Sequence, residues 1–297
     1  MGSARFGKVL SAMVTPFEDD GSLDVGGAAD LARWLVDHGH DGLVLAGTTG
    51  EAPTLTDDEK VELWTAVRQA VDVPLVAGSG SNDTRHSVEL SKRAVATGVD
   101  GLLVVVPYYS RPPQAGVEAH MRAVAAATDL PVLMYDVPLR TGRAMAVDTI
   151  VRLATQVPNI VGLKDARGNA PEAARIVAEA PDDFDLYSGD DSMTLALLAA
   201  GGVGVVGVTT HWSAMLMGEM IAAFERGDHR TAQTVNARLA PWFGYQSTEL
   251  WQAPTAVKTL LGELGLPSGP CRLPLAPAPD EARVRAQEII EALEVTK

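Results

Sequence analysis

Eight short apolar runs recur along the chain, and this repetition constrains its fold more than any other feature. Each run is rich in Val, Leu or Ile without polar alternation, which is typical of parallel strands buried on both faces. Segments with helical spacing of apolar residues lie between the runs, and one of them begins with the capping-box pattern Thr56-Asp57-Asp58-Glu59. The runs occupy residues 9–17, 42–48, 74–80, 101–107, 131–138, 160–166, 185–191 and 202–210.

Eight strand–helix repeats predict an α/β protein with a closed (β/α)₈ TIM barrel, because eight parallel strands close such a barrel. An open, doubly wound sheet is the alternative, but no run has the weaker apolar character of an edge strand. We expect the barrel to occupy residues 1–227 and an appended C-terminal helical domain to occupy residues 228–297. Within that extension, periodicity predicts helices over 228–243 and 255–264 and a last helix from Asp280.

Charge and cysteine content disfavour several classes of function. The chain has 24 Lys and Arg against 38 Asp and Glu, a formal net charge of −14, which repels nucleic-acid phosphates. Its single cysteine, Cys271, leaves no intrachain disulfide or cysteine metal cluster, which suits a reducing compartment. No leader pattern opens the sequence and no apolar stretch has the length of a membrane span. We therefore expect a cytoplasmic protein with neither nucleic-acid nor membrane partners.

Lys164 is the most informative single residue, because the chemistry of a barrel lies where its strands end. Among the lysines of the chain, it alone lies within a strand-like apolar run, Ile160-Val161-Gly162-Leu163-Lys164-Asp165-Ala166. Burying an ammonium is costly unless it is paired or neutralised, and a neutral amine can attack a carbonyl to form a Schiff base. The alternative is a buried pair with Asp165, which the opposite directions of adjacent strand residues disfavour.

Polar residues at the ends of other runs suggest what such an amine would act on. Tyr135 ends the fifth run and is either a packing residue or an acid/base group one strand from the lysine. Arg140 follows on the same loop, where it either binds a carboxylate or lies in solvent. The segment Gly47-Thr48-Thr49-Gly50-Glu51 offers hydroxyls and backbone N–H groups to an anion such as a carboxylate, unless it is a plain glycine-rich turn.

Other motifs carry weaker signals. Pro107-Tyr108-Tyr109 ends the fourth run, where paired aromatics most often pack in the core or at a subunit interface. Ser188-Gly189-Asp190-Asp191 has two carboxylates without a His or Glu cluster, so we expect no metal. The glycines at 202, 204 and 207 match the dinucleotide fingerprint but lie inside a strand, so we expect no such cofactor. His38 and His40 are expected to be a solvated pair rather than zinc ligands.

Taken in order, these motifs resemble the dihydrodipicolinate synthase / N-acetylneuraminate lyase family of class I aldolases. The likeness extends from residues 12–17 to residues 272–274, which is nearly the whole chain. The resemblance implies a Schiff-base lyase that condenses pyruvate with L-aspartate-4-semialdehyde to 4-hydroxy-tetrahydrodipicolinate, in diaminopimelate and lysine biosynthesis. The blocks that carry it are GTTGE at 47–51, PYY at 107–109, YDVPLRTG at 135–142, GLKDA at 162–166 and SGDD at 188–191.

The resemblance implies catalytic roles for four residues. Lys164 would form the imine with pyruvate, and loss of a methyl proton would give an enamine that attacks the aldehyde. Tyr135 would carry protons, and the Thr49 hydroxyl would link it to Tyr109. In this family the second tyrosine reaches in from the neighbouring subunit, so the site would need a dimer.

The resemblance also implies binding roles and an assembly. Thr48 and Thr49 would hydrogen-bond the pyruvate carboxylate, and Arg140 would bind the carboxylate of the semialdehyde. The backbone of Gly189 and Val206 would line the lysine. The implied assembly is a homotetramer, a dimer of dimers, with neither a metal nor an organic cofactor.

The chain departs from the family pattern near the expected aldehyde site. Asp136 stands where many relatives have Asn, and Trp212 follows an unusual run after the eighth strand. Two alternatives therefore stay open: a sibling pyruvate-dependent aldolase acting on a sugar acid or another aldehyde, and a non-catalytic paralogue that binds keto acids. Lysine-sensitive relatives hold the inhibitor with a glutamate and histidines, whereas this chain has His86 and Lys60, so we expect weak or absent inhibition by lysine.

Overall fold

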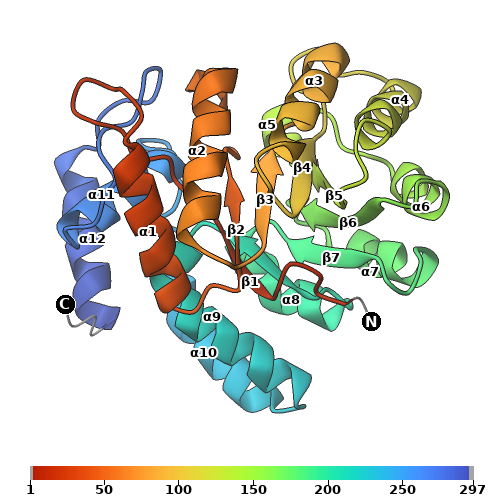
Figure 1. Cartoon of the computed structure of the whole chain (residues 1–297). Coiled ribbons are helices and arrows are strands. Elements are labelled where there is room, and N and C mark those ends of the chain that lie inside the picture. Colours follow the sequence, from red (N-terminus) through yellow and green to blue (C-terminus); the bar gives the residue numbers. More distant parts are fainter. Residues whose placement is uncertain (1–2, 294–297) are drawn as a thin grey trace.

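The computed structural model describes residues 3–293, and its eight strands close into a parallel barrel (Figure 1). Consecutive strands pair around the ring, and β1 closes it against β8. The predicted (β/α)₈ barrel is confirmed, and every strand lies inside one of the eight apolar runs. The strands are β1 (Val9–Ala12), β2 (Gly42–Leu45), β3 (Leu75–Gly78), β4 (Gly101–Val105), β5 (Val132–Asp136), β6 (Ile160–Asp165), β7 (Asp185–Ser188) and β8 (Gly204–Gly207).

Helices surround the barrel and cover its strands (Figure 1). The predicted capping box begins α2: the Thr56 hydroxyl accepts from the Glu59 N–H at 3.2 Å, and the Glu59 carboxylate accepts from the Thr56 N–H at 2.8 Å. The helices up to the eighth βα unit are α1 (Val25–Asp37), α2 (Asp57–Ala70), α3 (Thr84–Val95), α4 (Gln114–Ala125), α5 (Pro138–Thr141), α6 (Val147–Gln156), α7 (Ala170–Glu179), α8 (Thr194–Ala199) and α9 (Thr210–Glu225), with short 3₁₀ turns η1 (Ala52–Thr54) and η2 (Asp191–Met193).

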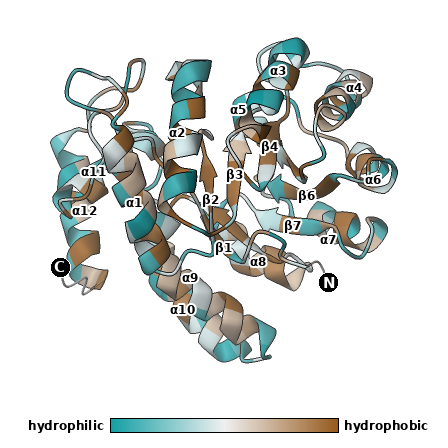
Figure 2. Cartoon of the chain, in the orientation of Figure 1, coloured by the Kyte–Doolittle hydropathy of each residue, from teal (hydrophilic) through white to brown (hydrophobic). Residues whose placement is uncertain are grey.

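Two apolar layers make the core, one inside the barrel and one between the strands and the helices. The strands are buried on both faces, and Figure 2 shows their apolar colouring at the centre of the molecule. Such burial explains why they read in the sequence as continuous apolar runs. The inner layer includes Leu10, Val44, Leu133, Tyr135 and Val206.

Three helices follow the barrel at the bounds that periodicity led us to expect, to within about two residues. They are α10 (His229–Phe243), α11 (Ala253–Glu263) and α12 (Asp280–Leu293). Helix α10 packs along α9, and α11 packs against α12. Whether residues 228–297 form a domain of their own stays a prediction. Among residues 3–293, no helix combines the length and the apolar character needed to cross a bilayer.

Candidate active site

Lys164 and Tyr135 are neighbours across strands β6 and β5, near the carboxyl ends of both. The register pairs the two residues directly. Lys164 is 4% exposed and Tyr135 is 5% exposed, and the Lys164 Nζ lies 4.4 Å from the centroid of the Tyr135 ring. Strand pairing thus places a primary amine beneath an aromatic ring and out of bulk water.

The buried Lys164–Asp165 pair, the alternative interpretation of this strand, does not form. Asp165 points to the other face of β6, where its carboxylate accepts from Arg167 Nη2 at 2.7 Å and from Arg167 Nε at 3.0 Å. Across residues 3–293, no carboxylate oxygen lies within 4.0 Å of the Lys164 Nζ. The amine is therefore free to meet a substrate.

Gly189 packs against the lysine, as the resemblance implies. A Cβ at Gly189 would lie 3.0 Å from the Lys164 Cγ and 3.1 Å from the Ala166 Cβ, so a larger residue would push on the lysine stem. Val206 on β8 is fully buried in the inner layer that also holds Tyr135. The structure places Gly189 against Lys164, and the part that Gly189 and Val206 play at the lysine and in substrate binding stays a prediction.

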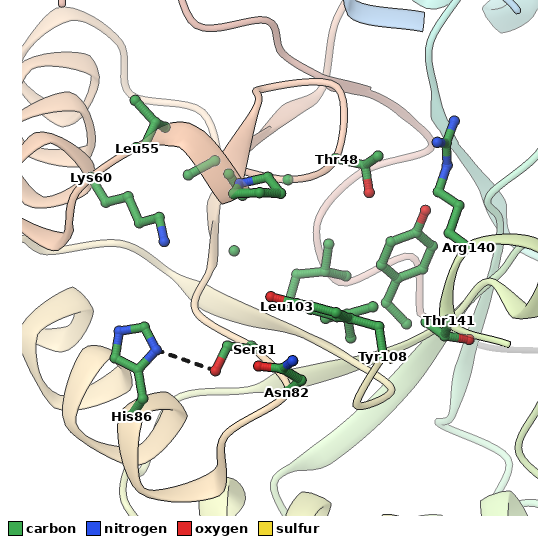
Figure 3. Close-up of a pocket in the computed structure, with 18 of the residues that line it drawn as sticks. Thr48, Leu55, Lys60, Ser81, Asn82, His86, Leu103, Tyr108, Arg140 and Thr141 are labelled. Atoms are coloured by element: carbon green, nitrogen blue, oxygen red, sulfur yellow. Dashed lines mark hydrogen bonds between the residues drawn. The ribbon is translucent and has the colours of Figure 1, made fainter. Parts of the chain in front are cut away.

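A cavity of about 460 Å³ opens at the same end of the barrel (Figure 3). Its lining includes Tyr135, Thr48 and Arg140, three of the residues that the sequence singles out. This volume suits small-molecule ligands. Tyr135 both lines the cavity and contacts Lys164, so it connects the open space to the buried amine.

The loop after β2 presents the two threonines in a compact, strained turn. Thr48 is half-buried at the cavity, and Thr49 is 3% exposed. The Glu51 N–H donates to the Thr48 carbonyl at 3.1 Å and closes the turn. Ala46 and Glu51, on either side of the threonines, have φ angles of +52° and +55°. Left-handed backbone at residues other than glycine often marks functional loops.

Arg140 and Tyr109 differ in where the structure places them. Arg140 lies on α5, a single turn after β5, and lines the cavity on the same side as Thr48 (Figure 3). Tyr109 is 90% exposed, with a φ angle of +70°, so it does not fold back into its own barrel. Its neighbour Tyr108 lines the cavity instead. The structure brings Arg140 to Tyr135 and Thr48 and leaves Tyr109 outside.

Asp136 belongs to a buried charged cluster that the sequence analysis missed. Its carboxylate is fully buried, accepts from the Met145 N–H at 2.9 Å and lies 3.8 Å from the Arg167 Nε. Burial raises the pKa of Asp136 to about 7. Within the described residues, its Oδ1 has no hydrogen-bond partner. The one signal in the sequence was that Asp136 stands where many relatives have Asn. Its contact with Arg167 could not be predicted, because that contact depends on the register of β5 and β6.

The far side of the cavity from Thr48 holds Lys60 and His86, both labelled in Figure 3. His86 Nε2 lies 2.9 Å from an Asp57 carboxylate oxygen, and the Lys60 Nζ lies 4.0 Å from that carboxylate. Burial lowers the pKa of Lys60. The sequence analysis noted Lys60 and His86 but missed Asp57, whose carboxylate lies beside both of them.

The expectation of a solvated His38–His40 pair is wrong for His40. That ring is buried, where Nδ1 donates to the Leu35 carbonyl at 2.6 Å and Nε2 lies 2.7 Å from the Ser11 hydroxyl. Burial lowers the pKa of His40 to about 4, so the ring is neutral near pH 7. His38 is exposed and stacks on Trp34. In the described part of the chain, no group of three or more His, Cys, Asp and Glu side chains is placed to hold a metal.

Comparison with known proteins gives full-length matches. A model of the "Dihydrodipicolinate synthetase family" matches residues 5–293. The chain is 48% identical to a 4-hydroxy-tetrahydrodipicolinate synthase of Moorella thermoacetica, over 98% of this chain and 99% of that one. It is 52% identical to the synthase of Acidothermus cellulolyticus, over 99% and 94% of the two chains. The crystal structure of a Bacillus anthracis dihydrodipicolinate synthase superposes with a TM-score of 0.93 at 41% identity, with both chains 100% covered.

Proposed function

The chain belongs to the dihydrodipicolinate synthetase family, and we propose that Lys164 performs the family's reaction through an imine with pyruvate. The reaction condenses pyruvate with L-aspartate-4-semialdehyde to give 4-hydroxy-tetrahydrodipicolinate, a step in diaminopimelate and lysine biosynthesis. Relatives that are 42–52% identical over nearly the full chain have this activity in their names. One observation carries the proposal: a buried lysine amine without a carboxylate partner lies against the tyrosine that lines the cavity.

The first half of the reaction activates pyruvate. The Lys164 amine attacks the keto carbon of pyruvate, and loss of water gives a protonated imine. That imine withdraws electrons, so a methyl proton leaves and an enamine forms without a metal or an organic cofactor. Tyr135 donates a proton to the oxygen that leaves as water and exchanges protons in the later steps, because its side chain already lies against the amine.

The second half joins the two substrates. The enamine carbon attacks the aldehyde carbon, whose oxygen takes up a proton to become the hydroxyl group. The amine of the semialdehyde then displaces Lys164 from the imine carbon, closes the ring and regenerates the free lysine. The overall reaction releases one water, which is the water lost when the first imine forms.

Both substrates have a carboxylate that must bind to a chain with a net charge of −14. Thr48 and Thr49 give the pyruvate carboxylate hydroxyl and backbone N–H donors in the turn after β2. Arg140 gives the carboxylate of the semialdehyde a guanidinium, whose paired N–H groups match carboxylate geometry. Positive charge is thus concentrated at the cavity, although the protein as a whole is acidic.

Self-association completes the site in this proposal. Tyr109 is 90% exposed and Leu139, beside Arg140, is 95% exposed in the single chain. Exposed apolar side chains gathered beside a functional site are typical of an interaction surface. The chain forms a dimer in which Tyr109 enters the neighbouring site and meets Thr49, and two dimers make a homotetramer. The compartment is the cytoplasm, in keeping with the single cysteine, Cys271.

A coupled assay with purified protein, pyruvate and L-aspartate-4-semialdehyde tests the proposal. We expect turnover with this pair and none when N-acetylmannosamine or glyceraldehyde replaces the semialdehyde. Turnover with a sugar-derived aldehyde alone would identify a sibling aldolase. An imine with pyruvate but no turnover with any aldehyde would identify a keto-acid-binding paralogue.

A further inference from the structure

The carboxylate of Glu51 points away from the cavity and is bound by the C-terminal extension. Its side chain is 0% exposed, and its Oε1 lies 2.7 Å from the Nζ of Lys258 on α11. The two groups form a close ion pair, but the Glu51 Oε1 accepts no hydrogen bond of good geometry from residues 3–293. The other oxygen, Oε2, accepts from the Arg272 backbone N–H at 2.8 Å. Two residues more than 200 positions away along the chain therefore hold the end of the threonine loop.

Lys258 and Arg272 are themselves firmly placed. The Lys258 Nζ donates to the Pro270 carbonyl at 2.8 Å, and the cations of both residues lie 4.1 Å from the centroid of the Phe17 ring. Arg272 also donates to the Thr54 carbonyl at 2.8 Å. The C-terminal extension thus contacts the loop after β2 at two points, Glu51 and Thr54. Figure 1 shows α11 with α12, against which it packs, at the side of the barrel.

Backbone hydrogen bonds connect Glu51 to the threonines of the same loop. Its backbone N–H donates to the Thr48 carbonyl at 3.1 Å, and the Ala52 N–H donates to the Gly47 carbonyl at 3.1 Å. The Thr15 hydroxyl holds the Gly50 carbonyl at 2.7 Å. The side chain of Glu51 is fixed by the extension, and its backbone is hydrogen-bonded to Thr48. A shift of the Glu51 side chain would therefore move the backbone of Thr48.

The backbone conformation of Glu51 is stable only with contacts such as those from the C-terminal extension. A φ angle of +55° is unfavourable for a residue with a Cβ and persists only where surrounding contacts impose it. A buried ion pair is also a poor source of stability, because desolvating both charges offsets their attraction. The Glu51–Lys258 pair adds little stability, yet it fixes a strained residue at the edge of the threonine loop. Its role is therefore better explained by positioning that loop than by stabilising the fold.

We propose that Glu51 is a positioning residue, which Lys258 and the Arg272 backbone hold so that Thr48 and Thr49 keep the geometry that binds the pyruvate carboxylate. The proposal rests on the function proposed above, because it assumes that pyruvate binds at these threonines. It gives the C-terminal extension a role in catalysis that acts from outside the cavity.

Two variants test the proposal by separating the two substrates kinetically. Glu51→Gln keeps the shape of the side chain and removes its charge. The double variant Glu51→Gln/Lys258→Met removes both charges and leaves no unpaired ion buried. In both we expect the KM for pyruvate to rise ~10-fold or more, because a small displacement of positioning groups is costly, while the KM for the semialdehyde stays within about twofold. Lys258→Arg keeps the cation and should preserve most of the pyruvate affinity.

Tyr245→Phe is the matched control. The Tyr245 hydroxyl donates to the Ala256 carbonyl of α11 at 3.1 Å and touches neither Glu51 nor the threonine loop. Its loss should lower the melting temperature of the protein and leave the KM for pyruvate unchanged. A selective rise in the pyruvate KM in the Glu51 variants, and not in this control, supports positioning.

Two results would overturn the inference. One is an unchanged KM for pyruvate in the folded double variant. The other is an equal rise in both KM values, in the Glu51 variants and in the control alike, that follows the loss of melting temperature. Failure of the proposed function itself would differ from both, because the unaltered protein would then give no turnover with pyruvate and the semialdehyde.

Discussion

The amine of Lys164 and the ring of Tyr135 are held together by strand pairing, since the register of β5 and β6 sets these two residues side by side. The resulting separation is 4.4 Å from the Nζ to the ring centroid. Because the backbone fixes this contact, the ring should keep covering the amine when the hydroxyl is removed. The two contributions of Tyr135, packing and proton transfer, can therefore be separated by mutation.

Tyr135→Phe should retain imine formation and lose turnover. The phenylalanine ring still covers Lys164, so reduction with borohydride should trap pyruvate on the lysine. Without the hydroxyl, kcat should fall by ~10²–10⁴-fold, the usual contribution of a positioned acid/base group. Steady-state kinetics and mass spectrometry measure the two effects on the same sample.

Tyr187→Phe is the matched control for that variant. Tyr187 pairs with Lys164 on the other side, across β7, but its hydroxyl accepts from the Phe6 N–H at 3.2 Å. Its removal should cost stability and leave kcat within a few-fold of the unaltered protein. An equal loss of kcat in both variants would contradict a specific proton-transfer role for Tyr135.

Arg140→Ala should impair the second substrate only. We expect kcat/KM for the semialdehyde to fall by ~10–100-fold, the effect of losing one charge-assisted, paired contact, while pyruvate still forms its imine. Arg143→Ala, which removes a cation from the same loop but not from the cavity lining, is the comparison. If Arg140→Ala abolished imine trapping, Arg140 would be assigned to pyruvate instead.

Asp136→Asn should stabilise the protein at alkaline pH. The pKa of Asp136 is about 7 in the folded protein, raised by burial, whereas an exposed Asp has a value near 3.8. At a pH between these two pKa values, Asp136 binds more protons in the folded state than in the unfolded state. The buried Asp136 therefore destabilises the folded protein increasingly as pH rises. The Asn variant lacks this penalty, so its advantage in unfolding free energy should grow by ~1–3 kcal/mol between pH 5 and pH 8.

Asp165→Asn serves as the control for that pH dependence. Asp165 pairs with Asp136 in the sheet register, but its carboxylate is fully engaged by Arg167. Its neutralisation should destabilise the protein at both pH values. Unfolding in urea, monitored at each pH, compares the two variants. A constant difference between Asp136→Asn and the unaltered protein would contradict a titrating Asp136.

Free lysine should inhibit the enzyme weakly or not at all. The cavity side that holds Lys60 and His86 already carries the Lys60 amine, and the Asp57 carboxylate lies 2.9 Å from His86 Nε2 and 4.0 Å from the Lys60 Nζ. An added ammonium would find no free carboxylate among these three residues. The initial rate should therefore stay nearly constant as lysine is raised to millimolar concentrations. An inhibition constant in the micromolar range would contradict this expectation.

Much of the barrel could be predicted from the sequence because its signal is local. Strands buried on both faces give continuous apolar runs, and the residues that end those runs meet at one end of a parallel barrel. Lys164 was recognisable because an amine inside such a run is costly to bury. Tyr135, Arg140 and Thr48 could be grouped with it because Tyr135 and Arg140 lie at the end of one strand and just after it, and Thr48 follows another strand toward the same end.

The rest depended on relations that the sequence does not encode locally. The contact of Asp136 with Arg167 requires the strand register, and that of Glu51 with Lys258 requires the place where α11 packs. Lys258 did give a signal, since Pro254 and Leu261, four residues before and three after it, lie on the same buried helix face. For the adjacent pair Tyr108 and Tyr109, the left-handed backbone at the second residue decides which ring faces the cavity.

Reduction of the purified protein with borohydride in the presence of pyruvate tests the central claim most directly. Peptide mass spectrometry should find a pyruvate-derived addition on Lys164 and on no other lysine, and Lys164→Arg should abolish it. If the folded protein carried no addition, or if the addition lay on another buried lysine such as Lys60 or Lys258, the assignment of Lys164 as the nucleophile would be wrong.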